Sequence, residues 1–365
     1  MTRSWRFSTL IDRHKALGSN LEDWSGMGTA WSYSGDPDKE YLAIRTKAGL
    51  MDVSGLKKVH ITGPHAAHLI DIATTRDPEK IYPGKSAYAC MLNEAGKFTD
   101  DCILYRTGPN SWMVVHGSGT GHEELTKAAM GRDVSIRFDD NLHDLSLQGP
   151  LAVDYLARHV PGIRDLPYFH HMQTQLFGLP VMISRTGYTG ERGYELVVVN
   201  DAAGALWDAL MAAGEEWGIA ACGLGSRDTL RTEMGYPLHG QDIGLDTNPV
   251  EAGLSWAVGW KKDAFFGREA VVRVKEAGPK RRLRGLVAVE RGIPRPGMGV
   301  TLTHDVPLAD ITSGTFSPTL KKGIGLALIP VMVAEDAQVG VDIRGRREIF
   351  QLVKPPFVDP SVKES

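Results

Sequence analysis

The order of apolar and polar residues predicts an antiparallel sheet backed by helices in the first third of the chain. Residues 57–63 alternate like a strand with one buried face, and residues 87–106 read as two strands joined by a turn at 93–96. Apolar spacings of three and four residues indicate helices between the strands. Further elements are expected as strands at 111–117 and 134–140 and helices at 36–50, 64–74 and 121–130, with Asp36 capping and Gly49 ending the first helix.

The middle of the chain partly repeats this order. Residues 144–160 read as a strand, a Gly-Pro turn and a helix, and residues 179–199 read as two strands around a glycine-rich loop. Residues 202–218 have the spacing of an amphipathic helix, and a glycine turn opens another helix at 222–235. Strands and helices mixed in this way are typical of the α+β class.

The last quarter of the chain differs from the rest. Residues 275–284 are charged, contain Gly-Pro and read as a linker. Short strands separated by Gly and Pro turns are expected after it at 283–289, 299–303, 324–329 and 348–354. This pattern is typical of a small β-barrel or sandwich. We therefore expect a first region at 1–275, with two α+β subdomains of which one spans roughly 52–136, and a β-barrel domain at 276–365.

Composition and charge are those of an ordinary globular protein. The 365 residues are 42% hydrophobic and 23% charged, with a formal net charge of −3 and no block of like charges, so neither a nucleic-acid arm nor a membrane patch is expected. No apolar stretch is long enough to span a bilayer, and the first residues lack the features of a signal peptide. Three widely spaced cysteines, Cys90, Cys102 and Cys222, favour reduced thiols and a cytoplasmic location.

The glycine-rich loop at 184–195 is the first candidate for chemistry. It places Tyr188 between two glycines and ends on Glu195. Glycines let a backbone approach a ligand closely, although the same pattern occurs in flexible hairpin loops. A tyrosine between two glycines is expected to offer its ring to a ligand rather than to pack in the core, which favours a binding role for Tyr188. The loop is not a phosphate loop, because the lysine is missing and the spacing differs.

Arg227 is the second candidate, because it lies near the start of a helix, where the helix dipole disfavours a cation. An acidic partner for Arg227 is expected, with a weak surface ion pair as the alternative, and Arg231 shares its face. Trp256 is either a core residue or the wall of a flat aromatic pocket. The histidines show no paired ligand spacing, so we expect no metal and no covalent nucleophile.

Several segments, taken in order, resemble one known family. They read GKSAYACMLNEAGKFTDDCILYR, SRTGYTGERGYEL, CGLGSRDTLRTEMGYPLHGQDI, PVEAGLSWAV, GIPRPG, TSGTFSPTLKKGIGLALIP and PPFV. The set is similar to the glycine cleavage system T-protein, the tetrahydrofolate-dependent aminomethyltransferase family, from about residue 8 to 358 with the spacing kept. The resemblance implies an α+β cloverleaf of domains around a central hole that holds folate, ending in a β-barrel, with the folate site in region 1–275.

The resemblance also implies roles for single residues. Neighbouring side chains of a strand point to opposite faces, so of Asp100 and Asp101 one should face inward. Asp101 corresponds to the catalytic acid/base, which makes Asp100 the outward residue. Glu195 corresponds to the clamp on the pterin, where a carboxylate can accept ring N–H groups, and Arg227 to the arginine that binds the folate. The remaining matches to the folate pocket are Tyr88, Tyr188 and Trp256.

The chain departs from the family pattern on the side where the one-carbon donor should arrive. The differences are Gly55-Leu56 in place of His-Met, His116 in place of an asparagine and His239 where a tyrosine is common. The front segment, with Trp24, is also reshaped. We therefore expect Leu56, His116 and His239 on the donor side. The HGSG segment at 116–119 instead resembles the folate domains attached to dimethylglycine and sarcosine dehydrogenases.

Three functions stay open at this point. The first is an aminomethyltransferase that takes its unit from a lipoyl-carrier protein and yields ammonia and 5,10-methylene-tetrahydrofolate. The second is a stand-alone demethylase that moves a methyl group from a small methylated amine, sulfonium or ether to give 5-methyl-tetrahydrofolate. The third is a folate-binding regulatory protein without transfer activity. Asp101, Arg227 and Glu195 weigh against the third.

Overall fold

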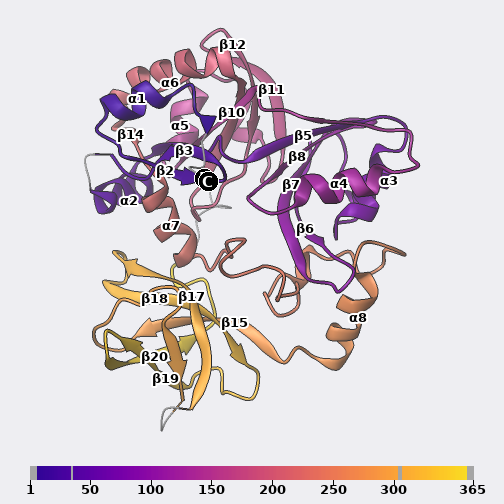
Figure 1. Ribbon diagram of the computed structural model, residues 1–365. Coiled ribbons are helices and arrows are strands. Elements are labelled where there is room, and N and C mark those ends of the chain that lie inside the picture. Colours follow the sequence, from indigo (N-terminus) through magenta and orange to yellow (C-terminus); the bar gives the residue numbers. More distant parts are fainter. Residues whose placement is uncertain (1–5, 34–35, 303–305, 360–365) are drawn as a thin grey trace.

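The computed structural model describes residues 6–33, 36–302 and 306–359. Figure 1 shows three lobes around a centre in which helix α7 (Leu224–Glu233) lies. Two lobes are sheets covered by helices, and the third is a closed barrel. The expected α+β class and the C-terminal β-barrel are therefore confirmed.

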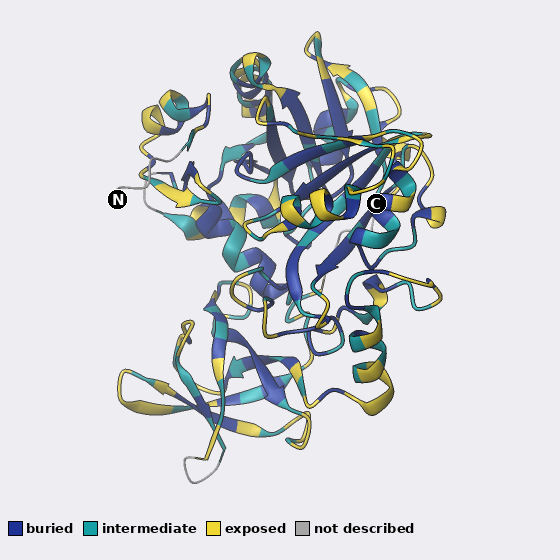
Figure 2. Ribbon diagram, turned by 45° about the vertical axis from the view of Figure 1, so that its right-hand side comes forward, coloured by how far each residue is buried: buried dark blue, intermediate teal, exposed yellow. Residues whose placement is uncertain are grey.

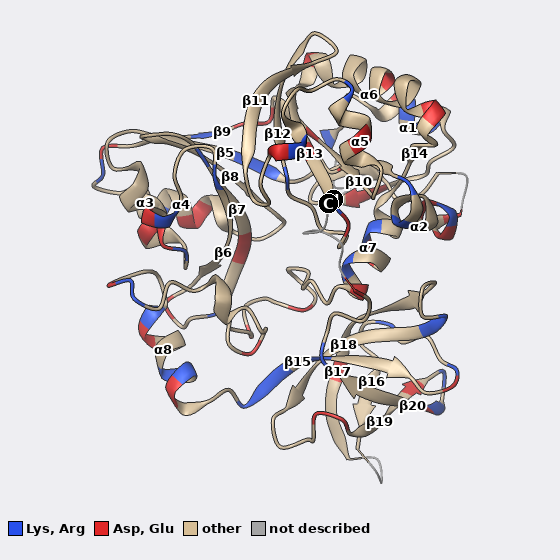
Figure 3. Cartoon of the chain, turned by 180° about the vertical axis from the view of Figure 1, so that it is seen from behind, with Lys and Arg blue, Asp and Glu red and all other residues tan. Residues whose placement is uncertain are grey.

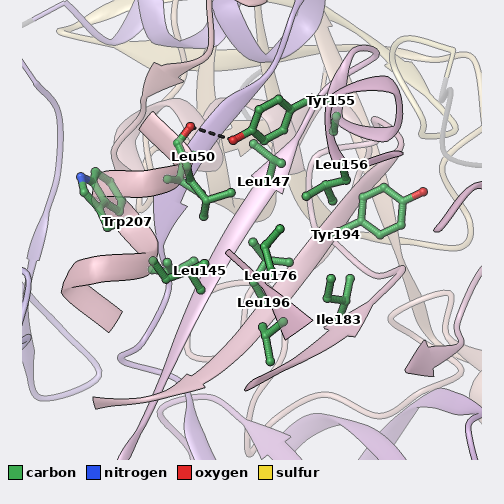
Figure 4. Close-up of a cluster of buried hydrophobic side chains, with 14 of the residues drawn as sticks. Leu50, Leu145, Leu147, Tyr155, Leu156, Leu176, Ile183, Tyr194, Leu196 and Trp207 are labelled. Carbon is green, nitrogen blue, oxygen red and sulfur yellow. Dashed lines mark hydrogen bonds between the residues drawn. The ribbon is translucent and has the colours of Figure 1, made fainter. Parts of the chain in front are cut away.

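The upper lobe in Figure 1 is built on a mixed six-stranded sheet. Its strands lie in the order β11 (His171–Leu176), β12 (Leu179–Ser184), β13 (Gly193–Val199), β10 (Leu142–Gln148), β4 (Gly49–Asp52) and β14 (Ala220–Ala221). Helices α5 (Ala152–Ala157) and α6 (Asn200–Gly214) pack on it over a buried apolar cluster that includes Leu147, Leu196 and Trp207 (Figure 4). In this cluster the Tyr155 hydroxyl donates a hydrogen bond to the Leu210 carbonyl oxygen, 2.9 Å away.

The second lobe is an antiparallel five-stranded sheet. Its strands lie in the order β6 (Ser86–Leu92), β7 (Phe98–Gly108), β8 (Ser111–His116), β5 (Lys57–Thr62) and β9 (Ser135–Phe138). Helices α3 (Ala66–Ala73) and α4 (Gly121–Ala129) pack against each other and cover the apolar residues of one face. The hairpin expected at 87–106 and the strands and helices expected between 57 and 140 are confirmed.

The N-terminal segment adds three short strands and two helices. The strands are β1 (Arg6–Phe7), β2 (Leu21–Trp24) and β3 (Met27–Ala30), and the helices are α1 (Ile11–Ala16) and α2 (Pro37–Thr46). Asp36 caps α2 as expected, since its carboxylate accepts a hydrogen bond from the Lys39 N–H at 3.2 Å. The expectation that Gly49 ends this helix is wrong. A Cβ at Gly49 would lie 2.5 Å from Ile44 Cγ1, so glycine lets strand β4 pass close to α2.

The third lobe is a closed six-stranded barrel. Its strands follow the order β15 (Arg281–Ala288), β18 (Lys322–Pro330), β17 (Pro307–Ser317), β16 (Gly299–Thr301), β19 (Gln338–Ile343) and β20 (Arg346–Val353). Four of the six were expected, and β17 and β19 were not; residue 303 of the strand expected at 299–303 lies outside the described residues. Helix α8 (Arg268–Ala277) was not expected either, and the boundary at 275–276 stays a prediction.

Buried polar contacts join α7 to the barrel. The Arg231 guanidinium, only 1% exposed, pairs with Asp242 at 2.7 Å and donates to the Ser313 hydroxyl at 2.8 Å. Glu233 accepts hydrogen bonds from Tyr41 and from Ser317 of the barrel. Figure 2 shows buried residues concentrated towards the middle of the molecule and exposed ones on the outer helices and loops. Helix α7 and the barrel therefore meet through buried hydrogen bonds.

Candidate functional site

A cavity in two connected parts opens where elements of the two sheet lobes and the segment after α7 come together. The outer part has a volume of about 850 Å³ and the inner part about 140 Å³. Both parts share walls made by Tyr88, Ile103, Phe169 and Tyr188. The residues that the sequence singles out as catalytic or folate-binding all line one part or both: Tyr88, Asp101, Tyr188, Glu195, Arg227 and Trp256.

Asp101 lies on β7, opposite Cys90 of β6, and its carboxylate faces the inner cavity. The Tyr88 hydroxyl donates a hydrogen bond to Asp101 Oδ2 at 2.9 Å. Burial, reinforced by the nearby charge of Asp100, raises the pKa of the Asp101 carboxyl from 3.8 to about 7. A carboxyl with this pKa is present in both protonation states near neutral pH, so it can both accept and return a proton.

Asp100 is not an outward residue, contrary to the expectation from the sequence. It is fully buried, and its carboxylate accepts hydrogen bonds from the backbone N–H of Asp101 at 2.9 Å and of Gly121 at 3.3 Å. His116 Nδ1 lies 2.8 Å from Asp100 Oδ2. The two aspartates do point to opposite faces of β7, but α4 begins over the second face, so protein covers Asp100 while Asp101 faces the cavity.

Glu195, on β13, is held by two side chains that the sequence did not single out. The Thr186 hydroxyl donates to Glu195 Oε2, and the Tyr105 hydroxyl lies 3.4 Å from the same oxygen. Burial raises the pKa of Glu195. Both contacts use Oε2, so within the described residues Oε1 keeps its lone pairs for a ligand that brings N–H donors.

Arg227, in the first turns of α7, is held between two aromatic rings. Its guanidinium carbon lies 4.3 Å from the centre of the Tyr188 ring and 5.3 Å from that of Trp24. Burial lowers its pKa, and no carboxylate of the described residues pairs with it. The acidic partner expected for Arg227 is therefore not supplied by the described protein residues. A desolvated cation without a counter-ion favours an anionic or strongly polar ligand.

Aromatic side chains form the remaining walls. The Tyr188 hydroxyl donates to the Pro237 carbonyl oxygen at 2.5 Å, and its ring stacks on Tyr236 with centroids 5.7 Å apart. Trp256 is 56% exposed at the mouth of the outer cavity, 5.6 Å from Tyr88 between ring centroids. The Arg76 guanidinium lies over it at 5.1 Å. Trp256 is therefore a wall of an aromatic pocket and not a core residue.

Leu56, His116 and His239, expected on the donor side, all line the inner cavity. Burial lowers the pKa of His239. Gly55 lies against Trp24, because a Cβ at this position would stand 2.7 Å from Trp24 Cε3. Glycine at position 55, where the family pattern has histidine, thus makes room for the Trp24 ring, which covers Arg227.

Some residues that line the cavity were not predicted from the sequence. Tyr105 stands four residues after Asp101 on the same strand and therefore on the same face, a signal that alternation alone could have given. Thr186 lies in the glycine-rich loop already singled out. Phe169, at a positive φ of 56°, belongs to a segment without a regular pattern, and nothing local points to it.

The described residues contain no group of three or more His, Cys, Asp or Glu side chains that could hold a metal ion. Within the same part of the chain, none of the helices is long and apolar enough to cross a membrane. Figure 3 shows the Lys and Arg residues interspersed with the Asp and Glu residues.

Comparisons with known proteins agree with this geometry. Residues 10–262 match the family model of the GCVT N-terminal domain, and residues 281–359 match that of the glycine cleavage T-protein C-terminal barrel domain. The chain is 50% identical to the heme-dependent oxidative N-demethylase gamma subunit of Ectopseudomonas mendocina, over 100% of this chain and 99% of that protein. It is 42% identical to the aminomethyltransferase of Frankia alni, over 97% and 98% of the two chains.

A solved structure has the same fold. The glycine cleavage system aminomethyltransferase T from Bartonella henselae superimposes with a TM-score of 0.92 at 31% identity, covering 98% of this chain and 99% of that one. Both family models, the relatives and the shared architecture agree over nearly the whole length. The chain therefore belongs to the glycine cleavage T-protein family.

Proposed function

We propose that this protein is a tetrahydrofolate-dependent one-carbon transferase that delivers a carbon at the oxidation level of formaldehyde, giving 5,10-methylene-tetrahydrofolate and a free amine. One observation carries the proposal: a carboxyl with a pKa of about 7, Asp101, shares an aromatic cavity with the unpaired cation Arg227 and with Glu195, which has an acceptor oxygen to spare. An acid–base group, a polar clamp and a cation in one pocket suit a reduced pterin with a charged tail.

Each residue has a role in this proposal. Glu195 Oε1 accepts ring N–H groups of the pterin, and Arg227 supplies a fixed charge for the folate. Tyr88, Tyr188 and Trp256 line the walls and exclude water from the bound ring system. Asp101 takes the proton that the attacking folate nitrogen releases when its new bond to carbon forms. Such a general base contributes about 10²–10⁴-fold to the rate.

Two donors fit the relatives. In the first, an aminomethyl group arrives on a lipoyl-carrier protein, as the family's aminomethyltransferases suggest. In the second, the carbon comes from a small N-methylated amine after oxidation by a partner subunit, because a relative that matches over the whole chain is a gamma subunit of an oxidative N-demethylase. Oxidation of an N-methyl group gives an iminium ion or formaldehyde, so this route also yields the methylene product. Direct methyl transfer, the stand-alone alternative, would yield 5-methyl-tetrahydrofolate.

The mass of the folate product tests the proposal. The full chain is incubated with tetrahydrofolate and, in separate reactions, with aminomethyl-loaded lipoyl carrier, with formaldehyde plus dimethylamine, and with dimethylamine alone. Methylene-tetrahydrofolate formed faster than in protein-free controls supports the proposal, and the accelerated reaction identifies the donor. No acceleration in any reaction would refute it, and 5-methyl-tetrahydrofolate from dimethylamine alone would establish the stand-alone demethylase instead.

The proposal includes a cytoplasmic location. Its basis is that the three cysteines, Cys90, Cys102 and Cys222, are all buried as free thiols, a state typical of reducing compartments. The test is fractionation of cells that make the tagged full-length protein. Recovery of the protein outside the cytosolic fraction would contradict the cytoplasmic location.

A further inference from the structure

A second titratable side chain, that of His116, belongs to the lining of the inner cavity and lies on the same face of the sheet as Asp100. His116 is the last residue of β8, and its ring is 1% exposed. Its Nδ1 lies 2.8 Å from Asp100 Oδ2, and two backbone N–H groups also donate to this carboxylate. Such a carboxylate fixes the orientation of a histidine ring with its Nδ1–H towards the carboxylate. Nε2 then accepts a hydrogen bond when the ring is neutral and has a proton to give when the ring is protonated.

The chain after His116 is shaped around this pair. A Cβ at Gly121 would lie 2.8 Å from His116 Nδ1, and a Cβ at Gly119 would lie 2.7 Å from Asp100 Cγ. A side chain at either glycine would displace the histidine or the carboxylate. Gly119 and Gly121 are therefore required for the observed contact between Asp100 and His116.

The inner cavity holds imidazole nitrogens that have no partner. His116 Nε2 and both ring nitrogens of His239 are inaccessible to solvent and make no hydrogen bond within the described residues. Both side chains line the same cavity, and the charges of Asp100 and His116 act on His239. A buried polar atom without a hydrogen bond costs about 1–3 kcal/mol, so three such atoms on side chains that belong to one cavity lining favour a polar ligand there.

We propose that His116 and His239 bind the nitrogen of the amine released from the one-carbon donor, and that His116, positioned by Asp100, gives this nitrogen its proton. The inference rests on the proposed function and names the ligand class at its donor end: ammonia or a small alkylamine. Leu56 and the Trp24–Gly55 contact supply apolar walls beside it, which suit short alkyl groups.

The step balances without an oxidant. The bond from the transferred carbon to the donor amine breaks, its electron pair stays on the amine nitrogen, and the protonated His116 ring gives its Nε2 proton to that nitrogen. A bond from the same carbon to the accepting folate nitrogen forms, and Asp101 takes the proton released there. Asp101 then loses this proton to water and His116 takes one from water, which restores both groups. Neither carbon nor nitrogen changes its oxidation level, and the amine leaves as a neutral molecule.

Amine binding is tested first, without turnover. The full-length protein with ¹⁵N-labelled histidine is titrated with methylamine and then with dimethylamine, and the ring nitrogen signals are followed by NMR. We expect two ring systems to shift in the wild-type protein and the His116 shift to be lost in His116→Asn. The control is His159→Gln, since His159 lies after α5 and lines neither part of the cavity. If no histidine signal responds to either amine, the inference is wrong.

Turnover gives the second readout. His116→Asn should lower turnover with an amine-bearing donor by about 100-fold or more while the Kd for tetrahydrofolate stays within about twofold. In His116→Ala, added imidazole should restore part of the rate, which a merely structural histidine would not allow. Wild-type turnover in His116→Asn would overturn the inference. Absence of product with the wild-type protein would instead refute the proposed function, and the amine titration would still decide whether the histidines bind amines.

Discussion

Asp101→Asn should make the protein more stable at alkaline pH while it removes the proposed catalytic group. The pKa of Asp101 in the folded protein, about 7, is above its ordinary value of 3.8. Between these values the folded protein holds one proton more than the unfolded chain, so the free energy of unfolding falls as pH rises through this window. Above about pH 7 the Asp101 carboxyl is ionised in both the folded and the unfolded protein, so this group lowers the free energy of unfolding no further.

The size of the effect follows from the shift. About three pKa units correspond to about 4 kcal/mol at 1.36 kcal/mol per unit, an upper limit because water in the cavity screens the charge. About two of these three units lie between pH 5 and pH 7, so about two thirds of the limit is lost between pH 5 and pH 8.5. The pH-dependent gain from Asp101→Asn is then at most about 2.7 kcal/mol, which corresponds to about 3–4 °C in Tm for a chain of this length.

The assay is thermal and urea unfolding of the wild-type protein and Asp101→Asn at pH 5 and pH 8.5. The two proteins should differ little at pH 5, and the variant should be the more stable at pH 8.5. The matched contrast is Asp100→Asn, which should lower stability at both pH values because that carboxylate accepts three hydrogen bonds.

A result with equal differences between wild type and Asp101→Asn at the two pH values would refute the reasoning, since it would mean that Asp101 titrates near its ordinary pKa. In that case Asp101 could not serve as an acid–base group near neutral pH. Turnover by Asp101→Asn should drop about 100-fold while folate binding is retained. This measurement tests the catalytic role of Asp101 independently of its effect on stability.

Other changes test the scaffold of the site. Gly55→Ala should destabilise the protein by about 1–3 kcal/mol and alter tryptophan fluorescence, because its Cβ would collide with Trp24; an unchanged Tm and spectrum would contradict this packing. Arg227→Gln should weaken tetrahydrofolate binding about 10- to 100-fold by calorimetry, the loss expected for one charged hydrogen bond, and unchanged affinity would remove Arg227 from the proposed folate site. Arg231→Met should lower the free energy of unfolding by about 3–5 kcal/mol, because it leaves Asp242 buried without its partner, and an unaltered urea midpoint would show that the pair is dispensable.

Sequence patterns predicted elements well where local signals are strong. The hairpin of β6 and β7 was found from its turn and its alternation, and Asp36 was recognised as a helix cap. Alternation also placed Asp100 and Asp101 on opposite faces. It could not show that α4 covers the second face, because that contact joins parts of the chain about twenty residues apart.

The same limit applies to helix faces and glycines. Arg227 and Arg231 share the spacing of one face, yet Arg231 reaches the barrel at Ser313, a residue far away in sequence. Gly49 reads as a helix stop, but it is a strand glycine needed for a close approach to Ile44. The residues of the candidate site were predicted from a series of segments that resemble one family in the same order, and not from any local sequence pattern. The structure places those residues together, and their roles stay a proposal.

The contacts between α7 and the barrel have a consequence for synthesis on the ribosome. The Glu233 carboxylate accepts a hydrogen bond from the Ser317 hydroxyl, and the Glu233 backbone carbonyl oxygen accepts the N–H of Phe357 at 2.7 Å. Arg231 likewise needs Ser313. The helix that carries Arg227 therefore gains its last buried partners only after nearly the whole chain has left the exit tunnel. The proposed folate pocket, although encoded mainly in the first two lobes, should become fully ordered late, when the C-terminal strands close the barrel.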